Sequence, residues 1–208
     1  LIRDEEKCLF AEVKSAVAGR GVVIAGTGSN STAEAIQATR AAEQIGVDAC
    51  LLVVPYYNKP TQEGLYQHFR IIAESTSLPC ILYNVPSRTV VSISAETIIR
   101  LSRIDNIVGL KEASGNMQQV ARVIEGVPED FLVWSGNDTD TLPILALGGY
   151  GVISVASHLA GNQIKQMIDS FLAGDTAAAA ESHRRLLPLV NALFAVANPI
   201  PTKYAMNH

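Results

Sequence analysis

The sequence is poor in cysteine and histidine and has no long hydrophobic run, and each of these absences excludes a class of protein. The three cysteines form no CxxC pair, and the four histidines are scattered without the spacing of metal ligands. No apolar stretch approaches the roughly 20 residues of a membrane span. We therefore expect no metal, no cofactor and no membrane segment. Cys50 and Cys80 lie inside apolar runs and are expected to be buried reduced thiols of a cytoplasmic protein.

Positive charge is also scarce. The 16 Lys and Arg residues are outnumbered by 20 Asp and Glu residues, and no basic stripe is present. A nucleic-acid partner is therefore not expected, because nothing would neutralise its phosphates. Residues 1–20 carry acids early and indicate an amphipathic helix, which differs from the basic-then-apolar order of a signal peptide.

Short apolar runs alternate with longer helical patterns along the whole chain. The runs begin roughly 20–30 residues apart, which is the spacing of successive βα units. Because they are continuously apolar, they indicate parallel strands covered on both faces. We predict strands at Val22–Ala25, Ala49–Val53, Pro79–Tyr83, Ile107–Lys111, Phe131–Ser135 and Gly151–Ser154.

Helix signals fill the intervals between these runs. The Ser31-to-Glu34 segment is a capping box that opens a helix running to about Ile45, with Gly46 as its stop. Four more segments have similar signals, and two further segments are rich in alanine and leucine. The predicted helix starts are Thr61, Ser94, Asn116 and about Asp138, followed by helices near 160–173 and 175–195.

Six βα units in a row are compatible with a TIM barrel or an open doubly wound sheet. A barrel collects its site from many strand ends, whereas an open sheet concentrates it at one switch point. Polar residues follow several predicted strands here, which favours an α/β TIM (β/α)8 barrel. Such a barrel has eight strands and typically about 250 residues. We therefore expect a partial barrel without its first two units, forming a single domain over 1–208, with a C-terminal helical segment from about 158 that is cut short.

Lys111 is the most informative residue, because it ends a buried strand. An amine in such a poorly solvated place has a lowered pKa, as Schiff-base chemistry on a carbonyl substrate requires. The alternative is a lysine that extends toward solvent and pairs with Glu112. Tyr83 ends the preceding strand and is followed closely by Arg88. An amine, a phenol and a guanidinium at neighbouring strand ends form a candidate site.

Two glycine-rich segments also follow strands. Gly26-Thr27-Gly28 lacks the third glycine and the later acid of a dinucleotide loop, so a tight strand-to-helix turn is the better interpretation. The segments Ser135–Asp138 and Gly148–Ser154 carry no cation. We expect these two to approach a small uncharged or carboxylate group, not a phosphate.

Five segments in order resemble the dihydrodipicolinate synthase (4-hydroxy-tetrahydrodipicolinate synthase) family of pyruvate-dependent class I aldolases. The segments are PYYNKP, ILYNVPSRT, GLKEASGN, SGNDTDTLPILALGGYGVISV and NPIPTKYA. The resemblance runs from the GTGSN turn to Tyr204. It implies a (β/α)8 barrel that condenses pyruvate with aspartate semialdehyde in diaminopimelate and lysine biosynthesis.

The resemblance also implies roles for the catalytic residues. Lys111 resembles the lysine that forms the pyruvate Schiff base, and Tyr83 resembles the tyrosine that moves protons. Tyr57 resembles the tyrosine that crosses a dimer interface and completes the neighbour's proton relay. A homo-oligomer, a dimer of dimers (homotetramer), is therefore expected. A Thr-Thr-Gly-Glu segment of the family, which supplies a relay threonine, is absent from this sequence.

Substrate-binding roles are implied in the same way. Arg88 resembles the arginine that holds the semialdehyde carboxylate, a task suited to a guanidinium fork. Gly136 and Ile153 resemble backbone positions that line the pyruvate pocket.

A regulatory site is implied for three residues that match the lysine feedback site of inhibited members. These are Asn30, Glu34 and Tyr56. Asn30 and Glu34 also have a local explanation as turn and capping residues, so both interpretations stay open.

Two alternatives to this function are considered. Another pyruvate aldolase, such as N-acetylneuraminate lyase or a keto-deoxy sugar acid aldolase, would share the lysine and the tyrosine. Arg88 favours a short substrate with a second carboxylate. The other alternative is a non-catalytic fragment, because six strands cannot close an eight-stranded barrel.

Overall fold

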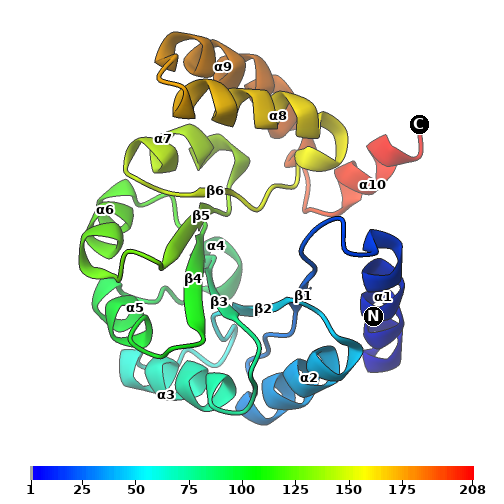
Figure 1. Cartoon of the computed structure of the whole chain (residues 1–208), viewed down its shortest axis with the longest axis vertical. Coiled ribbons are helices and arrows are strands. Elements are labelled where there is room, and N and C mark those ends of the chain that lie inside the picture. Colours follow the sequence, from blue (N-terminus) through cyan, green and yellow to red (C-terminus); the bar gives the residue numbers. More distant parts are fainter. Residues whose placement is uncertain (1) are drawn as a thin grey trace. The chain divides into compact units, whose positions relative to one another are not determined.

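A computed structural model describes residues 2–208 and divides into two compact units. The first unit extends to Leu132, and the second runs from Val133 to His208. Each unit alternates strands with helices (Figure 1). The expectation of a single domain over 1–208 stays a prediction.

The first unit contains four parallel strands in chain order, with helices outside them in Figure 1. Parallel pairing is what the continuously apolar runs predicted, because both faces of the sheet are covered. Its elements are α1 (Arg3–Val17), β1 (Ile24–Gly26), α2 (Thr32–Ile45), β2 (Ala49–Val53), α3 (Gln62–Ala73), β3 (Cys80–Asn84), α4 (Pro86–Thr89), α5 (Ala95–Leu101), β4 (Ile107–Glu112) and α6 (Met117–Gly126).

One row of leucines forms the helix-facing side of this sheet. Leu52, Leu82 and Leu110 are register partners on β2, β3 and β4, and all three are fully buried. Phe69 on α3 and Ile98 on α5 are fully buried as well. Burial of each such side chain contributes about 1.5–3 kcal/mol, so this layer fixes the strands and therefore the residues at their ends.

Four of the predicted helix starts are confirmed by side-chain caps. Ser31, Thr61, Ser94 and Asn116 each accept a hydrogen bond from the backbone N–H three residues later. Gly46 ends α2 with φ of 86°, the left-handed conformation that suits glycine.

In the predicted capping box on α2, the Glu34 side chain is connected to the Ser31 backbone N–H through Ser29. The Glu34 carboxylate accepts from the Ser29 hydroxyl at 3.1 Å. The Ser29 oxygen in turn accepts the Ser31 N–H at 3.2 Å. The loop before α2 is therefore held by its own side chains.

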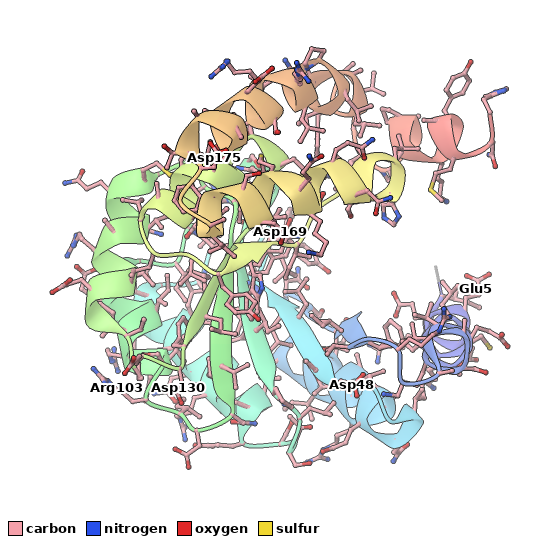
Figure 2. The ribbon with its side chains drawn as sticks, turned by 45° about the horizontal axis from the view of Figure 1, so that its top comes forward. Glu5, Asp48, Arg103, Asp130, Asp169 and Asp175 are labelled. Atoms are coloured by element: carbon pink, nitrogen blue, oxygen red, sulfur yellow. The ribbon has the colours of Figure 1, made fainter. Side chains whose placement is uncertain are left out.

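The N-terminal helix α1 is fastened to the strands through Asp48, which is labelled in Figure 2. Lys14 Nζ lies 2.7 Å from Asp48 Oδ1, and Asp48 Oδ2 accepts the Val23 N–H at 2.8 Å. The hydrogen bond from Lys14, followed by that from Val23, lowers the pKa of the Asp48 carboxyl. The predicted helix in residues 1–20 is thus confirmed as Arg3–Val17.

The second unit contains two paired parallel strands, β5 (Leu132–Ser135) and β6 (Gly151–Val152). The first residue of β5, Leu132, is the last residue of the first unit. Between them lie a 3₁₀ turn, Asp138–Asp140, and α7 (Thr141–Ala146). The predicted strand Gly151–Ser154 is two residues too long, although the Ile153 N–H still bonds to the Ser135 carbonyl at 2.9 Å.

Three helices complete the second unit: α8 (Ser157–Leu172), α9 (Thr176–Leu193) and α10 (Ile200–Met206). The first two correspond to the predicted alanine- and leucine-rich segments. They pack together around Ile164, Val190 and Leu193. Asp175, labelled in Figure 2 at the turn between them, caps α9 by accepting the Ala178 N–H at 2.9 Å.

Candidate active site

Lys111 and Tyr83 lie side by side at the ends of neighbouring strands. They are register partners on β4 and β3, so their side chains share one face of the sheet. Lys111 Nζ lies 4.3 Å from the centroid of the Tyr83 ring. Lys111 is only 9% exposed. The two groups that the sequence predicted to meet are therefore in contact.

The Tyr83 phenol is held in its protonated form. Burial raises its pKa above the ordinary value near 10, and the Arg88 charge offsets part of that rise. At neutral pH the hydroxyl is therefore a proton donor, and it can also accept a hydrogen bond.

Arg88 is placed by the short helix α4, which the sequence did not predict. Pro86 occupies the first turn of this helix, where its missing N–H costs nothing. The neighbouring Thr89 is buried, and its hydroxyl donates to the carbonyls of Val85 at 3.1 Å and Val91 at 2.8 Å. Arg88 itself is exposed. A fixed backbone thus carries a guanidinium with open access to a ligand.

Tyr57 lies in an exposed loop after β2. It is 88% exposed and has φ of 73°, an unusual conformation for a residue with a bulky side chain. Its loop is fastened to the loop after β1 by two asparagines. Asn30 Nδ2 donates to the Tyr56 carbonyl at 3.1 Å, and Asn58 Nδ2 donates to the Asn30 carbonyl at 3.0 Å. An exposed aromatic in a fixed, strained loop is available to a partner surface.

Two of the three residues of the predicted lysine site line one pocket. Glu34 and Tyr56 face a volume of about 190 Å³, which is also lined by Arg3, Glu6 and Thr27. Asn30 is adjacent through its bond to the Tyr56 backbone. The pocket offers both acidic and basic groups, as an amino-acid ligand requires.

In the second unit, Gly136 follows β5 directly, and Ile153, which was predicted to lie inside a strand, follows the neighbouring β6. Their loops are joined by Asp138, whose role sequence reasoning missed. Its buried carboxylate accepts from the Ser154 hydroxyl and from the N–H groups of Val155 at 3.1 Å and Ala156 at 3.2 Å. The sequence offered an acid that resembles a helix start, and nothing in it pointed to these distant partners.

The expected thiol environment is confirmed. Cys50 and Cys80 are fully buried, and desolvation raises the pKa of both thiols. Within residues 2–208 no group of three His, Cys, Asp or Glu side chains is arranged to hold a metal ion. None of the helices described over the same range has the length and hydrophobicity of a membrane span.

Comparison with known proteins identifies relatives over the whole chain. Residues 1–208 match the model of the dihydrodipicolinate synthetase family. The 4-hydroxy-tetrahydrodipicolinate synthase of Dehalococcoides mccartyi is 68% identical over 205 residues, covering 99% of this chain and 69% of the relative.

Solved structures agree with that match. The Cyanidioschyzon merolae enzyme with lysine bound has a TM-score of 0.98 and 52% identity, covering 100% of this chain and 71% of that one. The Acinetobacter baumannii enzyme complexed with pyruvate has a TM-score of 0.96 and 43% identity, with 100% and 71% covered. The predicted fold class, an α/β TIM barrel present in part, is confirmed. The chain belongs to the dihydrodipicolinate synthetase family.

Proposed function

We propose that Lys111 forms a Schiff base with pyruvate, and that this is the first chemical step of the reaction this chain carries out. The chain is a lyase of the class I aldolase type with 4-hydroxy-tetrahydrodipicolinate synthase activity. That activity condenses pyruvate with aspartate semialdehyde in lysine and diaminopimelate biosynthesis. The observation that carries the residue assignment is the contact between the buried Lys111 amine and the Tyr83 ring at 4.3 Å.

Lys111 begins the reaction as a nucleophile. The neutral amine adds to the pyruvate ketone, and loss of water gives an imine. The protonated imine withdraws electrons, so a methyl proton can leave to give an enamine. The enamine carbon attacks the semialdehyde aldehyde and forms the new carbon–carbon bond. The substrate's own amine then displaces Lys111, which releases the cyclic product and regenerates the free lysine.

Tyr83 moves the protons that these steps require. Adding the amine and expelling water need a donor and an acceptor at one place, and a neutral phenol can serve as both. The raised pKa of Tyr83 keeps that proton available at neutral pH. Tyr83 also packs its ring against the amine, which excludes water from one side of the nucleophile.

Arg88 would bind the semialdehyde carboxylate. Its guanidinium can make two parallel hydrogen bonds to a planar carboxylate, and its exposure leaves it open to an incoming substrate. The backbone at Gly136 and Ile153 would line the pyruvate pocket, held by the contacts of Asp138. A sugar-acid aldolase would instead need polar groups along a hydroxylated chain.

Two further assignments concern binding partners, namely a second copy of the chain and the amino acid lysine. Tyr57 would enter the site of a second copy, which agrees with its 88% exposure. A homo-oligomer, a dimer of dimers, would provide that contact. Lysine would bind beside Asn30, Glu34 and Tyr56, and the lysine-bound relative supports such an inhibitor.

Reductive trapping tests the proposal. Borohydride added with pyruvate reduces the imine to a stable secondary amine, and peptide mapping by mass spectrometry locates it. We expect the adduct on Lys111, and none in Lys111→Ala. An adduct on another lysine, or none in the full-length folded protein, would refute the assignment. Arg88→Ala should retain the adduct but lose semialdehyde turnover, whereas unchanged turnover with good cleavage of a sugar acid would favour the other aldolases.

A further inference from the structure

A buried carboxylate lies directly behind the candidate site. Glu112 follows Lys111 at the end of β4 and is only 1% exposed. Its register partner is Asn84, which follows Tyr83 at the end of β3. Because side chains alternate along a strand, Glu112 and Asn84 share the face opposite to Lys111 and Tyr83.

In every hydrogen bond described for the Glu112 side chain, the carboxylate is the acceptor. Asn84 Nδ2 lies 3.0 Å from each carboxylate oxygen. The Ser114 N–H donates to Oε1 at 2.7 Å, and Gln119 Nε2 on α6 donates to Oε2 at 3.3 Å. An amide in this place would turn its NH₂ group toward other donors. The surroundings therefore select a carboxylate.

The orientation of Asn84 is fixed by its other partners. Its Oδ1 accepts the Ile93 N–H at 3.3 Å, so its Nδ2 must face Glu112. Nδ2 also donates to the Ser92 hydroxyl at 3.2 Å. Gln119 Nε2 reaches the Ile93 carbonyl at 3.2 Å. The network thus joins the ends of β3 and β4 to α6 and to the loop that follows α4.

We propose that Glu112 is a positioning residue that holds the Lys111 amine against the Tyr83 phenol. The inference rests on the proposed function, because it concerns the same Schiff base. From the opposite face of the sheet, the carboxylate holds the ends of β3 and β4 in register. Through Asn84 it also holds the loop that follows α4, the helix that carries Arg88. A displacement of about 1 Å between reacting groups can slow a reaction by about a hundredfold.

Glu112→Gln in the full-length protein tests this role. The change keeps the shape of the side chain and places an NH₂ group among donors. We expect imine formation with pyruvate, followed by borohydride trapping over time, to slow by about tenfold or more. The double variant Asn84→Asp with Glu112→Gln exchanges donor and acceptor between the two positions. Because Gln119 Nε2 would still face the new NH₂ group, the double variant should recover only part of the lost rate.

Asn106→Ala is the matched control. Asn106 precedes β4 at the other end of the strand, and its Nδ2 donates to the carbonyls of Ala73 at 2.9 Å, Thr76 at 3.1 Å and Leu78 at 3.3 Å. Its loss should lower Tm, because these carbonyls lose their donor, and should leave the rate of imine formation unchanged.

The outcomes separate the two proposals. A wild-type rate in Glu112→Gln, a double variant no faster than Glu112→Gln alone, or an equal slowing in Asn106→Ala overturns the positioning role. If Glu112→Gln does not fold, Gln119→Met removes the longest bond to the carboxylate together with the bond from Gln119 Nε2 to the Ile93 carbonyl. An unchanged rate in that variant overturns the role as well. Absence of any Lys111 adduct in the wild-type protein overturns the proposed function, and this inference with it.

Discussion

At the scale of single residues, the protonation of Tyr83 decides what the site can do. Burial holds this phenol neutral by raising its pKa, so the residue can donate a proton where the Lys111 amine reacts. We expect Tyr83→Phe to keep the ring contact and to lower kcat on the order of 10²–10⁴-fold. Steady-state kinetics with a parallel measurement of Tm checks this. Full activity in the phenylalanine variant would contradict the proton-transfer role.

His68 makes the free energy of unfolding depend on pH. Burial lowers the pKa of His68 to about 4, and its Nε2 has no hydrogen-bond partner among the described residues. Nδ1 lies 2.9 Å from the Thr32 hydroxyl. An unfolded histidine has a pKa near 6.5, so the unfolded chain binds more protons than the folded one between about pH 4 and 6.5.

Protonation of His68 therefore destabilises the folded chain as the pH falls. The stability from neutral His68 is complete above about pH 6.5 and is lost as the pH falls toward 4, by an amount on the order of 3 kcal/mol. Denaturant unfolding at several pH values should show a flatter dependence in His68→Gln over that range. Parallel curves for the two proteins would show that this histidine does not set the slope.

At the scale of elements, Gly28 determines how closely the loop after β1 approaches β2. A Cβ at Gly28 would lie 2.4 Å from the Val53 nitrogen, whereas one at Gly26 would meet nothing within 4 Å. We expect Gly28→Ala to destabilise the protein by about 1–3 kcal/mol through overpacking. Gly26→Ala is the control and should change stability by less than about 0.5 kcal/mol. Equal unfolding free energies for both variants would contradict this reason for the second glycine.

Most elements could be predicted because burial alone sets them. The apolar run Ala49–Val53 is β2 without any shift, and the cap residues mark the helix starts. The prediction ended β4 at Lys111, yet the strand includes Glu112. Its pairing with Asn84 depends on residues 28 positions apart, which no local pattern reveals.

The same limit applies to the candidate site. Lys111 and Tyr83 could be predicted to meet, because neighbouring parallel strands end at the same edge. The short helix α4 and the bonds of Asp138 could not, since each depends on contacts formed only in the folded chain. The roles of Arg88 and Tyr57 came from resemblance and stay predictions.

At the scale of the whole molecule, the proposed role of Tyr57 calls for a second copy of the chain. Tyr57 is 88% exposed and held in a left-handed backbone conformation, and the proposal places it in a neighbour's site. If this is correct, Tyr57→Phe and Lys111→Ala should complement each other when co-expressed. A hybrid dimer would contain one site with both a lysine and a tyrosine.

Random pairing makes half of the dimers hybrid, so activity should return to about a quarter of the wild-type value. Each variant alone should stay far below that level. Turnover assays on the co-purified mixture provide the measurement. A mixture no more active than the average of its parts would show that Tyr57 acts within its own chain or not at all.

The most direct test of the central claim is a crystal structure of the full-length protein with pyruvate. The account predicts continuous electron density from Lys111 Nζ to the former ketone carbon. It also predicts that the Tyr83 hydroxyl lies within about 2.6–3.2 Å of a reacting atom. Unreacted pyruvate bound elsewhere, or a Lys111 amine turned toward bulk solvent with pyruvate present, would contradict it.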